Sequence, residues 1–347
     1  MRIITGEERG IGPSFARTSL SVLSGLYLLG YEARRAAYGA GLLRPSTVEA
    51  RVVSVGNITA GGTGKTPATI YFARQFFEDG QKVVVLSRGY GRSTPMDEPA
   101  GVSDGHAFLL SPRESGDEPY LIARKLPGVP VVVCGDRVRG ANFAIEKFNA
   151  ETIVLDDGFQ HVALSRDEDI VVIDSTAPFG FGHLLPRGLL REPLSALRRA
   201  TTFLLTRADE CKHGDTVERL RDINPTAEIL LSRHRPVRLS RLGAGDDFPY
   251  DFISGKRVLA LSSIGNPISF ETTLKRLGAE VAASLRFKDH HWYSLDDVET
   301  VQKAAQQSRA EHIVSTEKDG VRLGLLAEAP KDILLLEVEL EMIGCYH

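Results

Sequence analysis

The stretch that decides the fold is a glycine-rich octapeptide, which reads Thr59-Ala60-Gly61-Gly62-Thr63-Gly64-Lys65-Thr66. It follows an apolar run at residues 52–55, and a segment of helical composition follows it at residues 67–79. This strand–loop–helix setting, closed by Gly-Lys-Thr, is typical of a P-loop that binds nucleotide phosphates. Its glycines let backbone N–H groups turn toward phosphate oxygens, and the positive end of the helix points at the same place. We therefore expect residues 59–66 to bind the phosphates of ATP.

Within this loop Lys65 would reach the β- and γ-phosphates as a catalytic group, and the Thr66 hydroxyl would hold Mg²⁺. The loop departs from the usual pattern in one respect, because Thr59 stands six residues before the lysine where glycine is usual. A second signal agrees with the first. Residues 153–155 form an apolar run that ends in Asp156 and Asp157, which is the form of a strand that ligates Mg²⁺. The pattern does not say which aspartate contacts the metal.

The chain from residue 51 onward alternates apolar runs with helical segments. The runs are nearly continuous, which suits strands buried on both faces of a parallel sheet, and they occupy residues 52–55, 83–86, 129–133, 153–155, 170–173 and 203–205. This rhythm predicts an α/β fold of the P-loop NTPase type, with a doubly wound, mostly parallel sheet. A block at residues 251–330 is expected to form a second, smaller α/β domain. The expected domains are an N-terminal region (1–45), the P-loop domain (46–225), a two-stranded β linker (226–250 and 331–347) and that smaller domain.

Composition restricts the possible partners and compartment. The formal net charge of the 347 residues is −3, which gives no general attraction to nucleic acid, so no nucleic-acid partner is expected. The three cysteines, Cys134, Cys211 and Cys345, are odd in number and far apart. A disulfide framework is therefore not expected, and a reducing cytosol fits.

The N-terminal region contains an uncharged run at residues 18–31, which lies between Arg17 and the pair Arg34-Arg35. As a helix this run would cover about 21 Å, which is short of the roughly 30 Å of a bilayer core. Two interpretations remain open from composition alone. The helix packs on the domain core, or it lies in the plane of a membrane surface with leucines in the acyl boundary and arginines at the headgroups.

Several further strings matter together. In chain order they occupy residues 55–59, 86–92, 116–119, 135–137, 155–161, 185–193, 289–291 and 316–319. In this order, and with a P-loop that opens on threonine, the set resembles the tetraacyldisaccharide 4′-kinase family, the lipid A 4′-kinases of Gram-negative bacteria. The resemblance covers almost the whole chain, from the apolar N-terminal segment to the last expected strand.

The resemblance implies transfer of the ATP γ-phosphate to the 4′-hydroxyl of a tetraacylated glucosamine disaccharide 1-phosphate, with ATP and Mg²⁺ as cofactors. It implies an acylated disaccharide lipid as substrate and a two-lobed fold with a β linker. It also implies peripheral or monotopic attachment to the cytoplasmic face of the inner membrane, which favours the membrane interpretation of the N-terminal helix. We expect the chain to act as a monomer.

A sugar hydroxyl needs a group that takes its proton, and a carboxylate with an imidazole suits this task. With the resemblance, we expect Asp117, on a predicted loop of the P-loop lobe, to pair with His290, on a predicted loop of the other lobe. His290 is preferred to His291 by a small margin, because it directly follows Asp289. Glu118 is expected to join the Mg²⁺ shell. Arginines that would meet phosphate charges are Arg88, Arg137, Arg187 and Arg191. Residues 316–319 are interpreted as a helix N-cap without a catalytic role.

Two other classes of function fit parts of the sequence. A regulatory or assembly NTPase of the deviant P-loop group would carry an extra lysine just before the double glycine, but this chain has Ala60 there. A nucleotide-gated membrane adaptor without catalytic activity would explain the apolar helix, but it would not explain the acidic and imidazole strings. An acceptor-dependent transfer of phosphate distinguishes a kinase from both.

Overall fold

The computed structural model describes residues 10–243, 245–330 and 332–346. Its contacts divide the chain into two compact units. Unit 1 contains Met1–Arg88, Cys134–Arg233 and Glu341–His347, and unit 2 contains Gly89–Val133 and His234–Leu340. Residues 1–9 of the expected N-terminal region, together with residues 244, 331 and 347, lie outside the described residues. The segment Gly89–Val133, which we expected in the P-loop domain, clusters with unit 2.

Unit 1 is built on a parallel sheet. Its strands lie in the order β8-β7-β6-β1-β5-β2, and each pairs in parallel with its neighbours. The bounds are β1 (Arg51–Asn57), β2 (Val83–Ser87), β5 (Thr152–Asp156), β6 (Glu168–Asp174), β7 (Thr202–Thr206) and β8 (Glu228–Arg241). Strands β2 and β5 are buried along their whole length, as their continuous apolar sequence predicts. The predicted doubly wound, mostly parallel sheet is confirmed.

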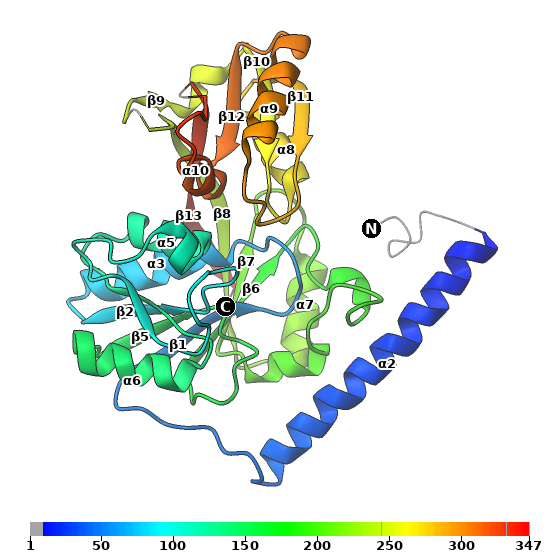
Figure 1. Cartoon of the computed structure of the whole chain (residues 1–347). Coiled ribbons are helices and arrows are strands. Elements are labelled where there is room, and N and C mark those ends of the chain that lie inside the picture. Colours follow the sequence, from blue (N-terminus) through cyan, green and yellow to red (C-terminus); the bar gives the residue numbers. More distant parts are fainter. Residues whose placement is uncertain (1–9, 244, 331, 347) are drawn as a thin grey trace. The chain divides into compact units, whose positions relative to one another are not determined.

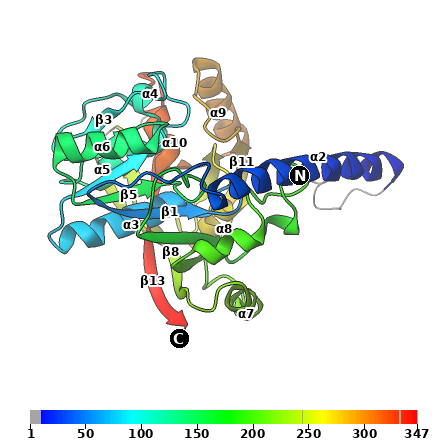
Figure 2. The same cartoon turned by 90° about the horizontal axis from the view of Figure 1, so that it is seen from below.

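Helices cover both faces of this sheet. Figures 1 and 2 show α3 (Lys65–Glu78) and α6 (Arg137–Phe148) on opposite faces. This follows from right-handed crossovers, since the chain moves outward from β1 to β2 and then returns through α6 to β5 between them. The remaining elements are α7 (Gly214–Ile223), η1 (Gly180–Gly182) and η2 (Leu194–Arg199). A core cluster built around Phe159, Leu197 and Phe203 joins the sheet to η2 and α7.

A loop at residues 183–191 contacts the P-loop through backbone hydrogen bonds. The Ala60 N–H donates to the Leu189 carbonyl at 2.7 Å, and Thr59 forms an isolated bridge with Leu190. Gly188 is needed at the tightest point of this loop. A Cβ placed on it would lie 2.2 Å from the backbone oxygen of His183, which is far inside van der Waals contact.

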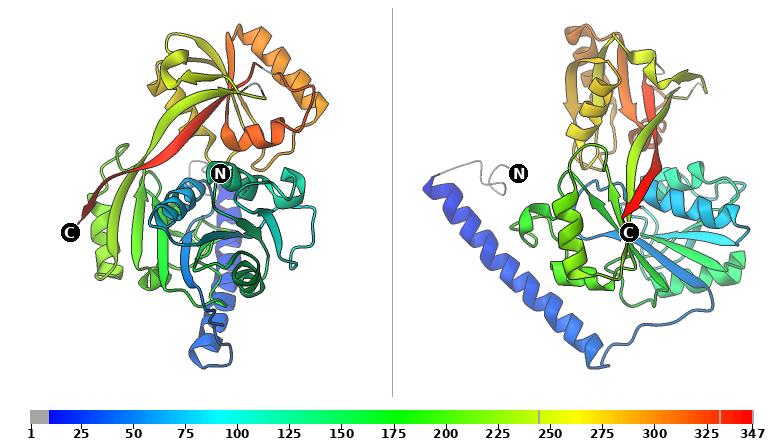
Figure 3. Two further views of the ribbon diagram at one scale, coloured as in Figure 1. Left: turned by 90° about the vertical axis from the view of Figure 1, so that its left-hand side faces the viewer. Right: turned by 180° about the vertical axis from the view of Figure 1, so that it is seen from behind.

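The N-terminal helix α2 runs over Ile11–Gly39, longer than the predicted run, and lies along the outside of unit 1 (Figure 3). One stripe faces solvent, because Phe15, Val22, Leu26 and Leu29 are 75%, 63%, 61% and 67% exposed. The other side contacts unit 1. There the Ser24 hydroxyl donates to a backbone carbonyl at 2.9 Å, and Tyr31 packs on the core cluster. Across the three described ranges, no helix combines the length and the apolar character that a membrane crossing requires.

Unit 2 contains a second α/β layer. Its strands lie in the order β11-β10-β12-β13, and the three neighbouring pairs run parallel. The bounds are β10 (Arg257–Ser262), β11 (Glu280–Arg286), β12 (His312–Thr316) and β13 (Leu334–Tyr346), with helices α8 (Pro267–Arg276), α9 (Leu295–Ser308) and α10 (Glu317–Leu323). Two core clusters enclose this layer. One contains Phe270 and Leu274 of α8, and the other contains Val301 of α9 and Leu323 of α10.

Unit 2 also contains shorter elements. They are β3 (Ala100–Ser103), α4 (Pro112–Ser115), α5 (Asp117–Lys125), β4 (Val131–Val133), β9 (Asp247–Pro249) and η3 (Tyr250–Ile253). Strand β3 pairs with β4, and β9 pairs with β8, in both cases antiparallel. The strands as a whole are therefore mixed rather than purely parallel.

Two long strands carry the chain between the units. The boundary between units falls inside β8, after Arg233, and inside β13, after Leu340. The two strands are neighbours and run side by side in Figure 3. Two ion pairs join the strands, Arg233–Glu341 at 2.6 Å and Arg235–Glu339 at 3.5 Å. The residue numbers rise along β8 while those of the partners fall along β13, which indicates antiparallel pairing. This matches the expected two-stranded β linker.

Substitution Gly188→Ala is expected to lower the free energy of unfolding by about 1–3 kcal/mol, because the added methyl forces the 183–191 loop to shift. Urea unfolding measures this change. Gly214→Ala is the control, since nothing lies within 4 Å of a Cβ placed there and its effect should stay within about 0.5 kcal/mol. Equal stability of the two variants would contradict the steric argument.

Candidate active site

The candidate residues fall into two groups, one in each unit. The first group surrounds the P-loop of unit 1. Strand β1 ends at Asn57, the loop follows, and α3 begins at Lys65. Gly61 and Gly64 have φ values of +117° and +89°, a region of backbone conformation that glycine enters without strain. The predicted strand–loop–helix geometry is present.

The loop is held by polar groups that are not part of the motif. The Asn57 side-chain amide donates to the Thr59 carbonyl and, at 2.9 Å, to the Thr63 hydroxyl. From the end of β7, the Thr206 hydroxyl donates to the Thr63 carbonyl at 2.9 Å. Arg207, which follows it, pairs with Asp174 at the end of β6. The loop conformation is therefore fixed by the ends of neighbouring strands as well as by its own glycines.

Lys65, Asp157 and Arg191 form a charged cluster beside the loop. The Lys65 ammonium lies 3.8 Å from an Asp157 oxygen, and one Arg191 nitrogen donates to both Asp157 oxygens at 2.9 Å. Burial alone would raise the pKa of Asp157, but Lys65 and Arg191 outweigh burial and lower the pKa below its usual value. Asp157 is therefore ionised at neutral pH. The amide of Arg191 also donates to the Ile58 carbonyl at 2.8 Å, so Arg191 is tied to the loop.

Asp156 has different surroundings. It is 4% exposed, and its two oxygens accept hydrogen bonds from the hydroxyls of Thr69 on α3 and Ser87 on β2, at 3.2 and 2.8 Å. Neutral hydroxyl donors hold this carboxylate in place at the end of β5. The two aspartates thus differ in their direct contacts, because Asp157 pairs with Lys65 and Arg191 while Asp156 accepts from two hydroxyls, and both attract the Arg137 guanidinium.

Two more expected arginines lie in unit 1. Arg137, the first residue of α6, is 3% exposed, and its Nε and Nη2 have no hydrogen-bond partner among the described residues. Burial lowers its pKa to about 10, while Asp156 and Asp157 act in the opposite direction. Buried guanidinium donors without partners are costly, and an anionic ligand would satisfy them.

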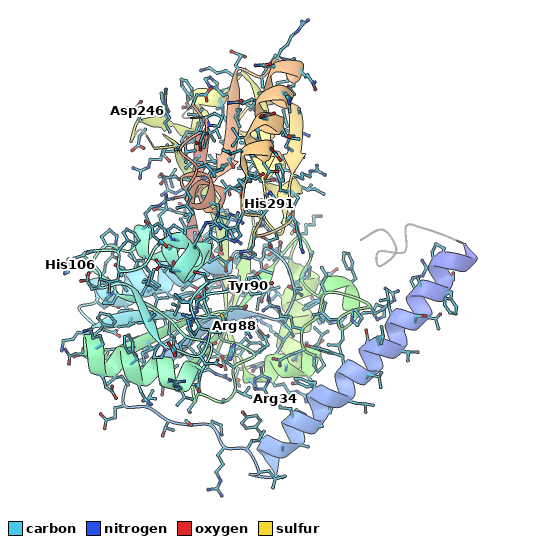
Figure 4. All side chains as sticks on the ribbon, in the orientation of Figure 1. Arg34, Arg88, Tyr90, His106, Asp246 and His291 are labelled. Carbon is cyan, nitrogen blue, oxygen red and sulfur yellow. The ribbon has the colours of Figure 1, made fainter. Side chains whose placement is uncertain are left out.

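Arg88 directly follows β2 and is exposed (Figure 4). Arg187 donates its backbone N–H to Ser24.

The second group lies in unit 2 and centres on Asp117. The Nδ1 atom of His290 lies 3.0 and 3.1 Å from the two Asp117 oxygens. Sequence reasoning placed Asp117 on a loop of the P-loop lobe. It is instead the first residue of α5, in the same unit as His290. The two residues are therefore already in contact within one unit, and their pairing needs no closure between lobes.

The Asp117 carboxylate is only 3% exposed, yet it is surrounded by positive charge. Burial alone would raise its pKa, but the hydrogen bond from His290 and the charges of Lys318 and Arg322 outweigh burial and lower it. Arg322 Nη1 lies 3.2 Å from an Asp117 oxygen. Burial would lower the pKa of His290, but the contact with Asp117 raises it overall. Asp117 is thus ionised at neutral pH.

A pocket of about 330 Å³ lies beside this pair. Its lining residues are Tyr90, Gly91, Asp117, Lys288, Asp289, His290, His291 and Trp292. The Tyr90 ring packs against the His290 ring at a centroid distance of 5.3 Å, and Trp292 packs under the Arg113 guanidinium. Tyr90 and His291 are labelled in Figure 4. The pocket offers aromatic faces and polar groups next to the buried carboxylate, which are surroundings that suit a sugar.

The structure distinguishes the two adjacent histidines. His291 Nε2 contacts Asp297 at 2.9 Å, in the capping box at the start of α9, and its ring stacks on Phe287. His291 therefore supports a helix end, while His290 contacts Asp117. Glu118, which we expected near Mg²⁺, forms an ion pair with Lys318 at 2.9 Å. Thr316 caps α10 as predicted, accepting from the Asp319 N–H at 3.1 Å.

This chain is similar to known proteins over almost its whole length. The family described as tetraacyldisaccharide-1-P 4′-kinase matches residues 16–344. A protein of Halothermothrix orenii named tetraacyldisaccharide 4′-kinase is 42% identical over 338 residues, covering 93% of this chain and 87% of that protein. One of the same name from Anaeromyxobacter sp. (strain Fw109-5) is 41% identical and covers 99% of this chain and 92% of its own.

One solved structure agrees with these relatives. The structure titled as the "apo" form of LpxK from Aquifex aeolicus in complex with ATP is 31% identical. It matches with a TM-score of 0.72 over 94% of this chain and 95% of that one. The chain belongs to the tetraacyldisaccharide-1-P 4′-kinase family. This membership confirms the resemblance seen in the sequence and does not favour the regulatory or assembly NTPase.

Sequence reasoning missed the residues that support the two groups. In unit 1 these are Asn57, Thr206 and Arg207, and in unit 2 they are Lys318 and Arg322. A signal for the second set was present, because Lys318 and Arg322 are four residues apart on a short helix whose neighbours Val321 and Leu323 are buried. Charged side chains on such a helix need partners, whereas the interpretation of residues 316–319 as a helix cap accounts only for the start of this helix.

Proposed function

We propose that this chain, a kinase of the lipid A pathway by its family, transfers the γ-phosphate of ATP to the 4′-hydroxyl of a tetraacylated glucosamine disaccharide 1-phosphate. The observation that carries the proposal is the buried, ionised Asp117 in contact with His290 beside a pocket, in a chain that also has a complete P-loop. Such a pair supplies what a sugar hydroxyl lacks, namely a group that accepts its proton as phosphate is transferred.

ATP would bind with its phosphates against the backbone N–H groups of residues 59–66, and Lys65 would reach the transferred phosphoryl group. Arg191, which is tied to the loop, and Arg137, which has unpartnered buried donors, are proposed to meet phosphate charge. Arg88, exposed at the end of β2, is proposed to do the same. Fixed positive groups of this kind stabilise the charge that spreads over the oxygens of the transferred group.

Mg²⁺ fits the donors that unit 1 presents. Thr66 offers a hydroxyl, and Asp156 and Asp157 offer carboxylates at the end of β5. Magnesium prefers such oxygen ligands and completes its shell with water and phosphate oxygens. Bound there, it would neutralise charge between the β- and γ-phosphates. Both carboxylates are proposed as ligands, directly or through water: Asp156 accepts from the Thr69 and Ser87 hydroxyls, and Asp157 pairs with Lys65 and Arg191.

Within the Asp117–His290 pair, we assign proton acceptance to Asp117. Its ionised carboxylate is held at the first turn of α5 and receives the Glu118 N–H at 2.9 Å. His290 orients the carboxylate and stabilises it.

Membrane attachment is proposed for α2. Its exposed stripe of Phe15, Val22, Leu26 and Leu29 has no covering among the described residues, and Arg17, Arg34 and Arg35 flank it. An in-plane helix with this pattern buries its apolar face at the acyl boundary. The substrate is itself a lipid, so we place the enzyme at the cytoplasmic face of the inner membrane, acting as a monomer.

The proposed function is tested by incubating the purified full chain with ATP labelled at the γ-phosphate, Mg²⁺ and the tetraacylated disaccharide 1-phosphate in detergent micelles. We expect label in the lipid at the 4′ position and negligible phosphate release without lipid. Hydrolysis that proceeds equally without the acceptor would overturn the proposal in favour of a simple NTPase.

Lys65→Ala is expected to abolish measurable transfer while the variant still folds and unfolds cooperatively in urea, because the transferred phosphoryl group loses its cation. The control is Lys82→Ala, which removes a lysine of an exposed surface ion pair and should keep near-normal kcat. Near-normal transfer by Lys65→Ala would show that residues 59–66 do not act as a catalytic P-loop.

For α2, the double substitution Leu26→Glu with Leu29→Glu is expected to release the protein from vesicles of phosphatidylethanolamine and phosphatidylglycerol. It should raise KM for the lipid while KM for ATP stays unchanged, because charge on the stripe opposes burial in the bilayer. Ser21→Glu with Gly25→Glu is the matched control, at exposed positions off the stripe. Substitution is sharper than deletion, because Tyr27 of the same helix donates to the Arg191 carbonyl at 2.6 Å. Equal vesicle binding by both double variants would refute the assignment.

Asp117→Ala and His290→Ala should each lower kcat by about 10²–10⁴-fold with little change in KM for ATP, because general-base assistance is lost. The double variant should be scarcely worse than the more damaging single variant if the two act as a unit. His291→Ala is the control and should keep most of kcat. If the losses multiply, the residues act independently, and a fully active His290→Ala would remove histidine from the mechanism.

A further inference from the structure

Helix α10 presents two cations to the Asp117–His290 pair. Lys318 and Arg322 lie four residues apart, and therefore on one face of the helix. Lys318 Nζ lies 3.3 Å from His290 Nε2, and Arg322 Nη1 lies 3.2 Å from an Asp117 oxygen. We propose that Lys318 is a positioning residue that fixes the tautomer and orientation of His290, while Arg322 holds Asp117. This inference rests on the proposed function, because it concerns how the proton-accepting pair is aligned.

The tautomer follows from which atoms can donate. A lysine ammonium carries three donors and no acceptor, so the ring nitrogen that faces it must offer its lone pair. His290 Nε2 is therefore unprotonated in this arrangement, and the ring proton sits on Nδ1. From there it is donated to Asp117, 3.0 Å away. With the opposite tautomer, Nε2–H would point at the ammonium and the Nδ1 lone pair would point at the carboxylate, so both contacts would be repulsive.

Lys318 is itself held on three sides. Its ammonium forms ion pairs with Glu118 at 2.9 Å and with Asp289 at 3.4 Å, besides the contact with His290. Glu118 belongs to α5, directly after Asp117, and Asp289 directly precedes His290. Lys318 thus connects the helix that carries one member of the pair to the turn that carries the other. His290 has a φ of +59° in that turn, a conformation that needs such support in a residue other than glycine.

Arg322 performs the corresponding task for Asp117. It is 1% exposed, and its Nη2 donates to Asp319 at 2.7 Å and to the Ser263 carbonyl at 3.2 Å. Asp319 is fully buried and also accepts from the hydroxyls of Ser263, Tyr293 and Thr316 at 2.6, 3.0 and 2.7 Å. A buried network with this many hydrogen bonds is rigid. It anchors the guanidinium, whose Nη1 forms an ion pair with the Asp117 carboxylate.

The other charged and aromatic groups near His290 do not fix the tautomer. Asp117 alone favours a proton on Nδ1 but leaves Nε2 free to be protonated, and Asp289 and Glu118 would attract a second proton. Tyr90 contacts the ring face, while Lys288 and His291 line the pocket. The Lys318 ammonium is the group whose contact with Nε2 is satisfied only when that atom is unprotonated.

Lys318→Met tests the inference, since it removes the ammonium and keeps an unbranched side chain. We expect kcat to fall about 10–100-fold, the usual cost of losing a residue that orients a functional imidazole, with KM for ATP unchanged. Lys318→Arg, which keeps the charge and the donors, should recover most of this loss. The control is Lys303→Met, which removes an exposed lysine of α9 paired with Glu299 and should not change kcat.

The Lys318→Met variant should fold. The glutamate and aspartate partners of Lys318 have side chains that are 31% and 41% exposed, so these carboxylates stay hydrated when the ammonium is removed. Glu118→Gln with Lys318→Met provides a charge-balanced second variant.

The tautomer of His290 can also be measured by NMR spectroscopy, independently of kinase activity. In the full chain with ¹⁵N-labelled histidine, the wild-type His290 should show a protonated Nδ1 and an unprotonated Nε2. Lys318→Met should show a mixture of tautomers or an imidazolium, and Lys318→Arg should resemble the wild type. Unchanged ¹⁵N shifts together with an unchanged kcat in Lys318→Met would overturn the inference.

Double variants separate this inference from the proposed function. If Lys318 acts through His290, then Lys318→Met should add little to the loss already caused by His290→Ala. Losses that multiply would show that Lys318 acts elsewhere and would overturn the positioning role alone. A fully active His290→Ala would instead remove histidine from the proposed mechanism, whatever Lys318→Met does.

Discussion

A carboxylate that stays ionised while almost completely buried is the constraint around which unit 2 is organised. Removing Asp117 from water favours its neutral form, and only fixed donors and cations can reverse that preference. The donors are the backbone of α5 and the turn at His290, and the cations are Lys318 and Arg322 on α10. Each of these elements must be in place for the carboxylate to keep its charge. The fold of unit 2 and the chemistry of Asp117 therefore depend on one another.

In unit 1 it is positive charge, rather than a buried negative charge, that the protein must balance. Its P-loop gathers N–H groups, Lys65 and arginines around a space that suits phosphate, and such a concentration of positive charge needs compensation in the protein itself. Asp157 supplies it by contacting Lys65 and Arg191. Asp156, at the same strand end, accepts from two hydroxyls and attracts the buried Arg137 guanidinium, whose pKa it raises against the effect of burial. The two adjacent aspartates thus have different hydrogen-bond partners because their neighbours come from different strands and helices.

Much of the fold follows from local sequence. Continuous apolar runs predicted buried parallel strands, the glycines predicted the loop between β1 and α3, and Thr316 predicted a helix cap. The second α/β layer and the linker strands followed from the same patterns. The grouping of residues 89–133 with the second unit did not, because strand and helix patterns describe elements and not which layer they join. The sequence predicted a loop at Asp117 for a similar reason. Gly116 precedes it, and the acidic residues at the start of this short helix have the composition of a loop.

The sequence by itself determined the P-loop, the strand that ends in two aspartates, the family resemblance and the presence of Asp117 and His290 as candidates. These features reside in short strings, where neighbouring residues set the backbone conformation and the chemical groups together. Only the tertiary structure decided that His290 rather than His291 contacts Asp117, 173 positions away along the chain, and that Lys318 and Arg322 support the pair. A hydrogen bond between distant segments depends on how helices and strands pack. Packing is set by the whole hydrophobic core, so no local pattern encodes it.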